Sequence, residues 1–340
     1  MVHPLIKDMF PTTLSLGLFI LYISLFVNQG WLVTASQNTN NSYSYSTAVA
    51  VLLAEILKLI ASVFIYAFKY PVFGLLTELK NNSKVFALYL IPASLYCLYN
   101  NLSFVNLSRF DPTTYFVVLQ LRVVVTGVIF QILFKKQLSQ KQWLSLFLLT
   151  FGCMVKQINF GDVDETSVKE TNKELSLSLT FYSIPLFAQL LCSCLAGVYN
   201  EYLLKTQGEV NVFVQNIFHN INSMICIGMV FAWQESFTWE SLAPFMELKV
   251  FLVVCNNAAI GVVTSFFLKY LNSILKNFAG ALELVFTAIL SYFLFAIPIY
   301  LNTIVSICLI LIATLMYSQN PVTNPKSKSN QKTGSLICSA

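Results

Sequence analysis

The sequence predicts an all-α membrane protein with ten transmembrane helices, arranged as a five-plus-five inverted repeat with both termini in the cytosol. Three observations support this prediction: the composition, ten long apolar segments, and a repeat between the two halves. Of the 340 residues, 56% are hydrophobic and only 10% are charged, and the mean hydropathy is +0.69. Soluble domains carry about 25% charged residues, so this chain has too few charges to cover a soluble surface.

A transmembrane helix needs about 20 mostly apolar residues. Segments of this kind occur at 12–34, 45–68, 85–106, 113–134, 143–160, 177–204, 211–233, 248–270, 274–296 and 298–318. The third and fourth segments are almost continuous. Pro112 separates them, because proline favours the first turn of a new helix. An even number of spans places both ends of the chain on one side of the membrane.

The distribution of lysine and arginine selects that side. With both termini in the cytosol, 13 of these residues are cytosolic and 5 lie on the other side, which agrees with the positive-inside rule. We therefore expect a ten-helix domain over 1–320, with halves at about 12–160 and 177–318 joined by a luminal loop at 161–176. Residues 321–340 are expected to form a disordered cytosolic tail. The sequon at Asn40 lies in a loop where glycosylation is permitted.

Two segments resemble each other at an offset of 161 residues. Residues 120–134 match residues 281–295 at Leu121 and Leu282, Thr126 and Thr287, Leu133 and Leu294, and Phe134 and Phe295. A repeat of five helices inverts its second copy in the membrane, and transporters with this plan bind solutes near the midplane. At the same offset Arg122 corresponds to Glu283. A charged side chain at the centre of the bilayer costs several kcal/mol, about 2.5–3.5 by insertion scales. Two such charges at corresponding positions indicate either a shared central cavity or a salt bridge that fixes two helices.

Other polar residues lie within the predicted spans. Glu55 and Lys58 are three residues apart on one helix face. Either Lys58 is a cation that faces the cavity with Glu55 as its local partner, or the two form an ion pair that only neutralises itself within the bundle. Tyr96, Asn100 and Asn101 follow within one span. Carboxamides can pair with a nucleobase edge while a tyrosine ring stacks on its face, or the amides can link neighbouring helices.

The fourth and seventh spans carry further polar positions. Tyr115 and Arg122 are two helical turns apart and point the same way. Asn216 and Asn220, at positions i and i+4, form one polar stripe. His219 lies beside them and is interpreted as a hydrogen-bonded structural histidine in preference to a proton relay.

The remaining candidates are Tyr199, Thr264, Ser265 and Lys276. Cations suit phosphates, whereas aromatic rings and amides suit a base and a sugar. The spans therefore indicate an anionic, amphipathic organic solute. No catalytic residue, cofactor or metal site is expected.

Five stretches carry a family resemblance: STAVAVLLAEILKLIAS (46–62), LYNNLSFVNLSRFDPTTYFVVLQLRVVVTGVIF (98–130), KKQLSQKQWLSLFLLTFGCMVKQ (135–157), AGVYNEYLLK (196–205) and KYLNSILKNFA (269–279). In these stretches and in its span order, the chain resembles the nucleotide-sugar transporters of the CMP-sialic acid and UDP-galactose group, within the drug/metabolite transporter superfamily.

The resemblance implies a multi-pass Golgi protein that imports UDP-galactose in exchange for UMP by alternating access. It implies no nucleic-acid partner, and it allows a homodimer in the lipid membrane. The implied substrate-binding residues are Tyr96, Asn100, Asn101, Tyr115, Arg122, Tyr199, Asn216, Asn220, Thr264, Ser265 and Lys276, with Glu55, Lys58 and Glu283 as cavity or gating charges.

Three departures from the family pattern bear on the nucleotide. Tyr99 precedes Asn100 and Asn101 where the family has glutamine. Arg122 stands where the sialic acid members have a phosphate-binding lysine, which changes a point charge into a planar fork. Asn220 matches a family tyrosine.

The sequence leaves other functions to compare with this one. UDP-N-acetylglucosamine or CMP-sialic acid is an alternative substrate. A membrane-embedded enzyme is disfavoured, because the spans lack a paired set of catalytic groups. A non-transporting scaffold or regulator is disfavoured, because it has no need of the desolvation cost of so many buried polar groups.

Overall fold

The computed structural model describes residues 9–36, 45–107, 110, 112–157, 173–234, 239–295 and 299–319. Asn40, most of the predicted loop at 161–176 and the predicted tail at 321–340 lie outside the described residues.

The described part of the chain is helical. The helices are α2 (Thr13–Ser36), α3 (Thr47–Lys69), α4 (Val72–Asn81), α5 (Ser83–Leu107), α6 (Pro112–Leu119), α7 (Arg122–Phe134), α8 (Gln140–Gln157), α9 (Lys173–Thr206), α10 (Val212–Gln234), α11 (Leu248–Tyr270), α12 (Ser273–Phe295) and α13 (Leu301–Gln319), with a 3-10 helix η2 (Trp239–Met246). Among the described residues, 8 helical segments are long and apolar enough to cross a membrane. This confirms the prediction of an all-helical, multi-pass membrane protein.

Two features of the helices differ from the sequence prediction. The first is α4, a short helix between the second and third spans, which was not expected. The second is a break within the predicted span 113–134. The backbone N–H groups of Gln120 and Leu121 donate to carbonyls only three residues earlier, at 3.1 Å each. This tighter turn separates α6 from α7 and makes Arg122 the first residue of α7.

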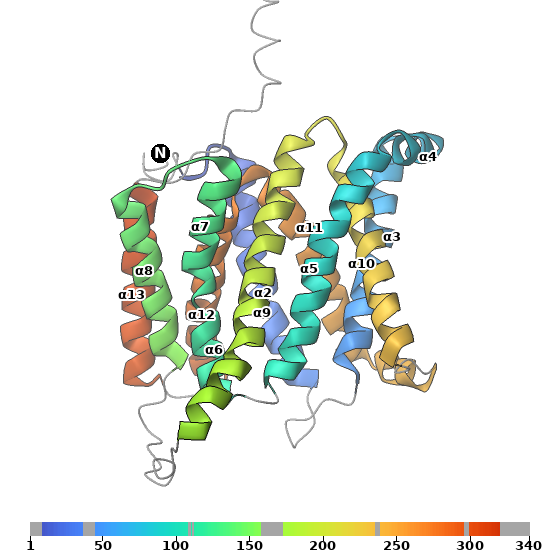
Figure 1. Cartoon of the computed structure of the whole chain (residues 1–340). Helices are drawn as coiled ribbons and strands as arrows, with labels where there is room; N and C mark the ends of the chain where they lie inside the picture. Colours follow the sequence, from blue (N-terminus) through green and yellow to red (C-terminus); the bar gives the residue numbers. More distant parts are fainter. Residues whose placement is uncertain are drawn as a thin grey trace, which may run out of the picture.

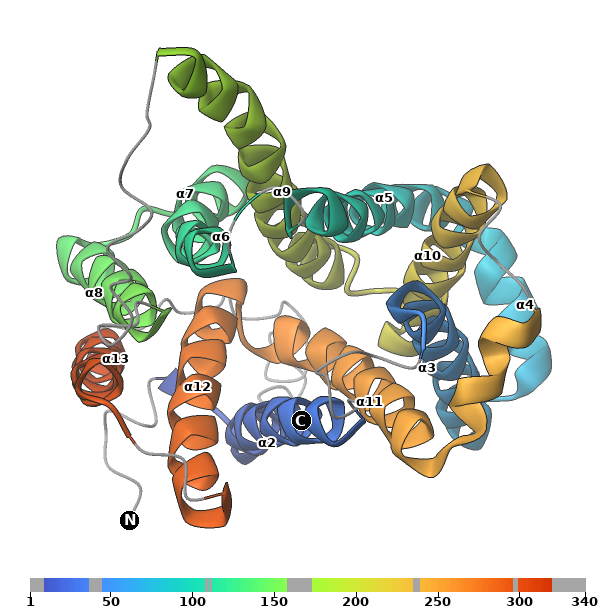
Figure 2. The same ribbon diagram turned by 90° about the horizontal axis from the view of Figure 1, so that it is seen from below.

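The long helices run alongside one another (Figure 1) and divide into two packed groups. In one group α9 packs against α5 and α7, and in the other α2 packs against α11 and α12. Viewed from below (Figure 2), the pair α3 and α10 closes one side of the bundle and the pair α8 and α13 the other. The cavity described below lies between these elements.

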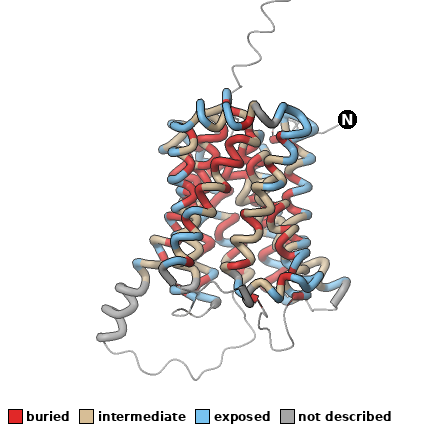
Figure 3. The backbone as a smooth tube through the Cα atoms, turned by 90° about the vertical axis from the view of Figure 1, so that its right-hand side faces the viewer, coloured by how far each residue is buried: buried red, intermediate tan, exposed pale blue. Residues whose placement is uncertain are grey.

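The two ends of the bundle differ in charge and burial. One end, where α2 begins and α13 ends, carries Lys69, Lys80, Lys84, Lys135, Lys136, Lys141, Lys205, Lys269 and Lys276. We call it the lysine-rich end. Buried residues gather toward this end, which is uppermost in Figure 3, whereas exposed and intermediate residues are more frequent toward the opposite end.

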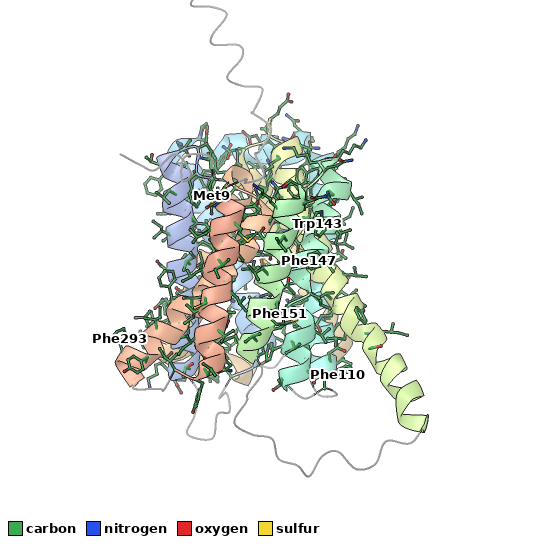
Figure 4. All side chains as sticks on the ribbon, turned by 90° about the vertical axis from the view of Figure 1, so that its left-hand side faces the viewer. Met9, Phe110, Trp143, Phe147, Phe151 and Phe293 are labelled. Carbon is green, nitrogen blue, oxygen red and sulfur yellow. The ribbon has the colours of Figure 1, made fainter. Side chains whose placement is uncertain are left out.

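The outer surface of the bundle is apolar. Trp143, Phe147 and Phe151 follow one another along α8 at four-residue spacing (Figure 4); Trp143 is partly buried against the core, whereas Phe147 and Phe151 are exposed. Phe147 is 55% exposed and Phe151 is 58% exposed. Such a surface suits contact with lipid tails, since the helical backbone already satisfies its own hydrogen bonds.

Helices α8 and α13 approach closely at Gly152. A Cβ atom at this position would lie 3.0 Å from the Leu309 Cβ atom and 3.2 Å from the Ile310 Cγ1 atom. We predict that Gly152→Val lowers the thermal unfolding midpoint of the detergent-solubilised protein, with an overpacking cost of about 1–3 kcal/mol. The same change at Gly17, where nothing lies within 4 Å, is the control and should have little effect. Equal midpoints for the two variants would contradict the close α8–α13 packing.

Candidate binding cavity

A cavity of about 240 Å³ lies between the two helix groups, and its lining extends from the middle of α3 and α5 to Asn200 and Lys276 near the lysine-rich end. Side chains of α3, α5, α9, α10, α11 and α12 line it. The sequence-predicted residues that the structure brings together there are Glu55, Lys58, Tyr96, Asn100, Asn216, Asn220, Thr264, Ser265 and Lys276.

One wall of the cavity carries an ion pair within α3. The Lys58 Nζ atom lies 2.5 Å from the Glu55 Oε1 atom, and the two side chains are only 15% and 11% exposed. The second oxygen of Glu55, Oε2, is buried without a hydrogen-bond partner among the described residues. A Cβ atom at Gly261 of α11 would overlap the Lys58 side chain, so glycine leaves the room in which this lysine lies.

A polar stripe on α10 forms another wall. Asn216, His219, Asn220 and Ser223 occupy positions i, i+3, i+4 and i+7, which places them on one helix face. In the described part of the chain, the Nδ2 atoms of both asparagines and the Nδ1 atom of His219 are buried without hydrogen-bond partners. The expectation that His219 is held by hydrogen bonds is thus not met at Nδ1. Unpaired buried polar atoms are costly, so this face is built to meet the polar atoms of a ligand or water.

Aromatic rings complete this side of the cavity. The centroids of the Tyr96 and His219 rings are 5.9 Å apart at a steep interplanar angle of 75°. Phe26 of α2 also lines the cavity. The flat face of a tyrosine beside amide donors can receive a stacked base or sugar ring.

Positive charge lies at the boundary of the cavity. Lys276, in the first turn of α12, lines it directly. Arg122 is exposed and lies outside the lining, but its charge interacts electrostatically with both Lys276 and Glu283. Arg122 and Glu283 do not form an ion pair within the described residues. The arginine therefore remains available to an anion instead of fixing the two helices.

Three other sequence-predicted residues point elsewhere. The Tyr115 hydroxyl accepts a 2.7 Å hydrogen bond from Gln189 Nε2, in a buried network that joins α5, α6 and α9. Asn101 Nδ2 donates to the Cys97 carbonyl within α5 at 2.8 Å. Tyr199 stacks on Tyr202, with ring centroids 6.1 Å apart.

The structure also adds residues that sequence reasoning did not select. Ser62, Asn200 and Ser223 line the cavity together with Phe26 and Gly261. Asn200 directly follows Tyr199, and consecutive residues of a helix point about 100° apart. The sequence does show a polar amide, Asn200, next to Tyr199 within an apolar span. Only the rotation of α9 in the bundle decides which of these two side chains faces the cavity.

Comparison with known proteins agrees with the cavity chemistry. The family model for nucleotide-sugar transporters matches residues 13–318. The UDP-galactose transporter senju of Drosophila melanogaster is 49% identical, and the match covers 94% of this chain and 89% of that protein. CMP-sialic acid transporter 1 of Oryza sativa subsp. japonica is 29% identical over 85% of this chain and 89% of its own length.

Two further similarities extend the comparison. The UDP-N-acetylglucosamine/UDP-N-acetylgalactosamine transporter nstp-4 of Caenorhabditis elegans is 29% identical, covering 84% of this chain and 87% of that protein. A solved crystal structure shares the fold with a TM-score of 0.65 at 12% identity, over 91% of this chain and 99% of the other. From the match along nearly the whole length of the bundle, we conclude that this chain belongs to the nucleotide-sugar transporter family.

Proposed function

We propose that the protein is a Golgi antiporter that imports UDP-galactose into the lumen in exchange for UMP. The observation that carries this proposal is the cavity itself, which combines two lysines with buried amide groups that have no partner among the described residues. The 49% identity to a protein named as a UDP-galactose transporter supports the choice of substrate.

The proposal includes ten spans and an inverted repeat. We take α8 and α10, which run alongside the other long helices (Figure 1), as the two spans that bring the 8 to ten. The packing of α9 on α5 and α7 has a counterpart in the packing of α2 on α11 and α12. These are corresponding pairs if halves of about 12–160 and 177–318 are related by inversion, with 161–176 as the connecting luminal loop and 321–340 as a tail.

The lysine-rich end is proposed to face the cytosol, in agreement with the positive-inside rule. Helix α2 begins and helix α13 ends at the lysine-rich end, so the two termini are cytosolic in this arrangement. The opposite end then faces the Golgi lumen, with Asn40 on that side.

Each part of the nucleotide has a chemical counterpart in the cavity. Lys276 and the exposed Arg122 supply the positive charge for phosphates, and Glu55, Lys58 and Glu283 are the proposed cavity or gating charges. Asn216 and Asn220 offer free donors to the oxygens of the base or ribose, and the other proposed contacts are Tyr96, Asn100, Thr264 and Ser265. Ligand pockets usually measure about 300–1,000 Å³, so this cavity holds part of the substrate and the rest extends toward Arg122.

Electrostatics then accounts for exchange without a coupled ion. When the cavity is empty, Arg122 and Lys276 act on each other as like charges. Moving unneutralised cations through the centre of the membrane is costly. A monophosphate or a nucleotide sugar neutralises them, so alternating access around the cavity is expected to proceed with a nucleotide on board.

The principal test is uptake by purified protein in liposomes. We predict that labelled UDP-galactose enters liposomes loaded with UMP, because UMP bound from inside neutralises the cavity and lets it return to the outer face. Liposomes loaded with CMP or with buffer are the controls and should show background uptake.

Competition ranks the alternative substrates in the same assay. An excess of UDP-N-acetylglucosamine that abolishes uptake would widen the substrate class to other uridine sugars. Uptake of CMP-sialic acid against CMP, with none of UDP-galactose, would overturn the base assignment. Absence of exchange with every nucleotide, from monodisperse protein, would favour a non-transporting role.

Arg122 provides the second prediction. Arg122→Ala should reduce exchange about 10- to 100-fold, because it removes charge-assisted hydrogen bonds worth about 1.5–3 kcal/mol to the phosphates. Arg122→Lys keeps the charge without the fork and should recover part of the activity. Full exchange in Arg122→Ala would show that the phosphates do not reach this residue.

Asn216 provides a third prediction, in which binding and stability change in opposite directions. Asn216→Leu removes a buried donor without a partner, so we expect unchanged or higher thermal stability of the empty protein and at least about tenfold weaker UMP binding. The control is Asn222→Leu on the same helix. Its Nδ2 atom donates to the carbonyls of Phe86 and Phe218 at 3.0 Å and 2.9 Å, so this change should lower stability.

Calorimetric titration with UMP and thermal unfolding in detergent would measure both effects. If Asn216→Leu destabilises the protein as much as Asn222→Leu does, Asn216 has a structural role and not a binding role.

A further inference from the structure

A second buried ion pair lies at the lysine-rich end of α9. The Glu201 side chain is completely buried, and its Oε1 atom lies 2.5 Å from Lys205 Nζ, one helical turn along α9. The proposed substrate cavity does not include either residue. A buried ion pair is weak evidence for stability, because desolvation offsets its attraction, so its purpose must be sought in its other contacts.

Those other contacts reach the corner between α11 and α12. Glu201 Oε2 accepts a 2.6 Å hydrogen bond from the backbone N–H of Ser273, the first residue of α12. Lys205 Nζ donates a 2.5 Å hydrogen bond to the carbonyl of Leu271, which follows the last residue of α11. The anion thus meets the amino end of one helix and the cation the carboxyl end of the other, and both arrangements match the helix dipoles.

This corner links the two helix groups near the lysine-rich end. α9 belongs with α5 and α7, whereas α11 and α12 belong with α2. The groups meet near the lysine-rich end, where Val198 of α9 and Ile274 of α12 are fully buried in the same core. Buried residues gather toward this end (Figure 3), so the two groups are packed together there in this conformation.

The corner also adjoins the cavity. Asn200, beside Glu201, and Lys276, one turn after Ser273, both line it. The charges of Glu201 and Lys276 interact electrostatically, so a phosphate that approaches Lys276 changes the balance of charge at the corner. Ligand binding and the corner contacts thus share the first turn of α12.

We propose that Glu201 and Lys205 are positioning residues that lock the gate at the lysine-rich end. They hold the α11–α12 corner against α9 while the cavity is closed on that side, and they release it when the carrier opens there. This inference rests on the proposed alternating-access function.

The arrangement keeps the cost of release low. Glu201 and Lys205 belong to the same helix and remain paired when the corner moves away. The two bonds that break are those to Ser273 and Leu271, and water can replace both partners once the gate is open. The lock is therefore reversible without leaving an isolated charge.

A charge swap separates a lock from an ordinary ion pair. Glu201→Lys together with Lys205→Glu keeps the pair within α9 but presents a cation to the amino end of α12 and an anion to the carboxyl end of α11. The isosteric Glu201→Gln, with a weakened acceptor, is the second variant. The reporter is Thr264→Cys in the cavity, in a background whose 8 native cysteines are replaced and whose thermal midpoint is retained.

The measurement is the rate of labelling by a membrane-impermeant maleimide, without nucleotide, in proteoliposomes sorted for one orientation. We expect both variants to label at least about fivefold faster from the lysine-rich side than the parent does, and more slowly from the other side. Parent rates in the charge swap would overturn the proposal, since a merely structural pair is restored by the swap. Labelling of the Glu201→Gln variant at the same rate as the parent would also overturn the proposal.

Because no nucleotide is present, the result does not depend on the identity of the substrate. Failure of UDP-galactose exchange would leave the labelling test intact, so the two proposals fail in distinguishable ways.

Discussion

A polar group inside a membrane must find its partner within the protein, and the organisation of this bundle depends on that constraint. Away from the cavity, many polar side chains are paired: Gln189 bonds both Asn106 and Tyr115, and Asn256 bonds Asn28. Along the face of α10 that lines the cavity, buried amide and imidazole atoms have no partner among the described residues. Buried atoms without a partner also occur elsewhere in the described residues, at Asn106, Asn277 and Thr287, but the largest group of them lines the cavity, where a polar ligand can pair them.

The buried charges follow a related rule. Each of the ion pairs formed by Glu55 with Lys58 and by Glu201 with Lys205 lies within one helix. A local pair neutralises itself wherever its helix moves, and its remaining hydrogen-bonding capacity is left for something else. For Glu55 that capacity faces the cavity, and for Glu201 it caps α12. One pair thus belongs to the site and the other to its entrance.

The break between α6 and α7 connects backbone and charge. It ends one helix at Leu119 and starts the next at Arg122, while the N–H groups of Val123 and Val125 still donate to the carbonyls of Gln120 and Leu121. Arg122 therefore lies in the middle of a span whose backbone stays hydrogen-bonded, where a cation is costly unless an anion meets it. The pairing of Arg122 with Glu283 that the repeat allowed does not form, which leaves the guanidinium accessible.

The sequence by itself determined the membrane class, the approximate positions of the 8 spans that the structure supports, the Glu55–Lys58 pair and the α10 stripe, because each depends on hydropathy or on spacing within one helix. It also determined the family, because the matching stretches run along the whole bundle. Only the tertiary structure decided that Asn200 and not Tyr199 lines the cavity, that Tyr115 joins Gln189, and that Glu201 reaches α12. Helix rotation and partner choice arise from packing between segments far apart in sequence, and a rotation of 100° per residue turns a small difference in packing into a different set of cavity residues.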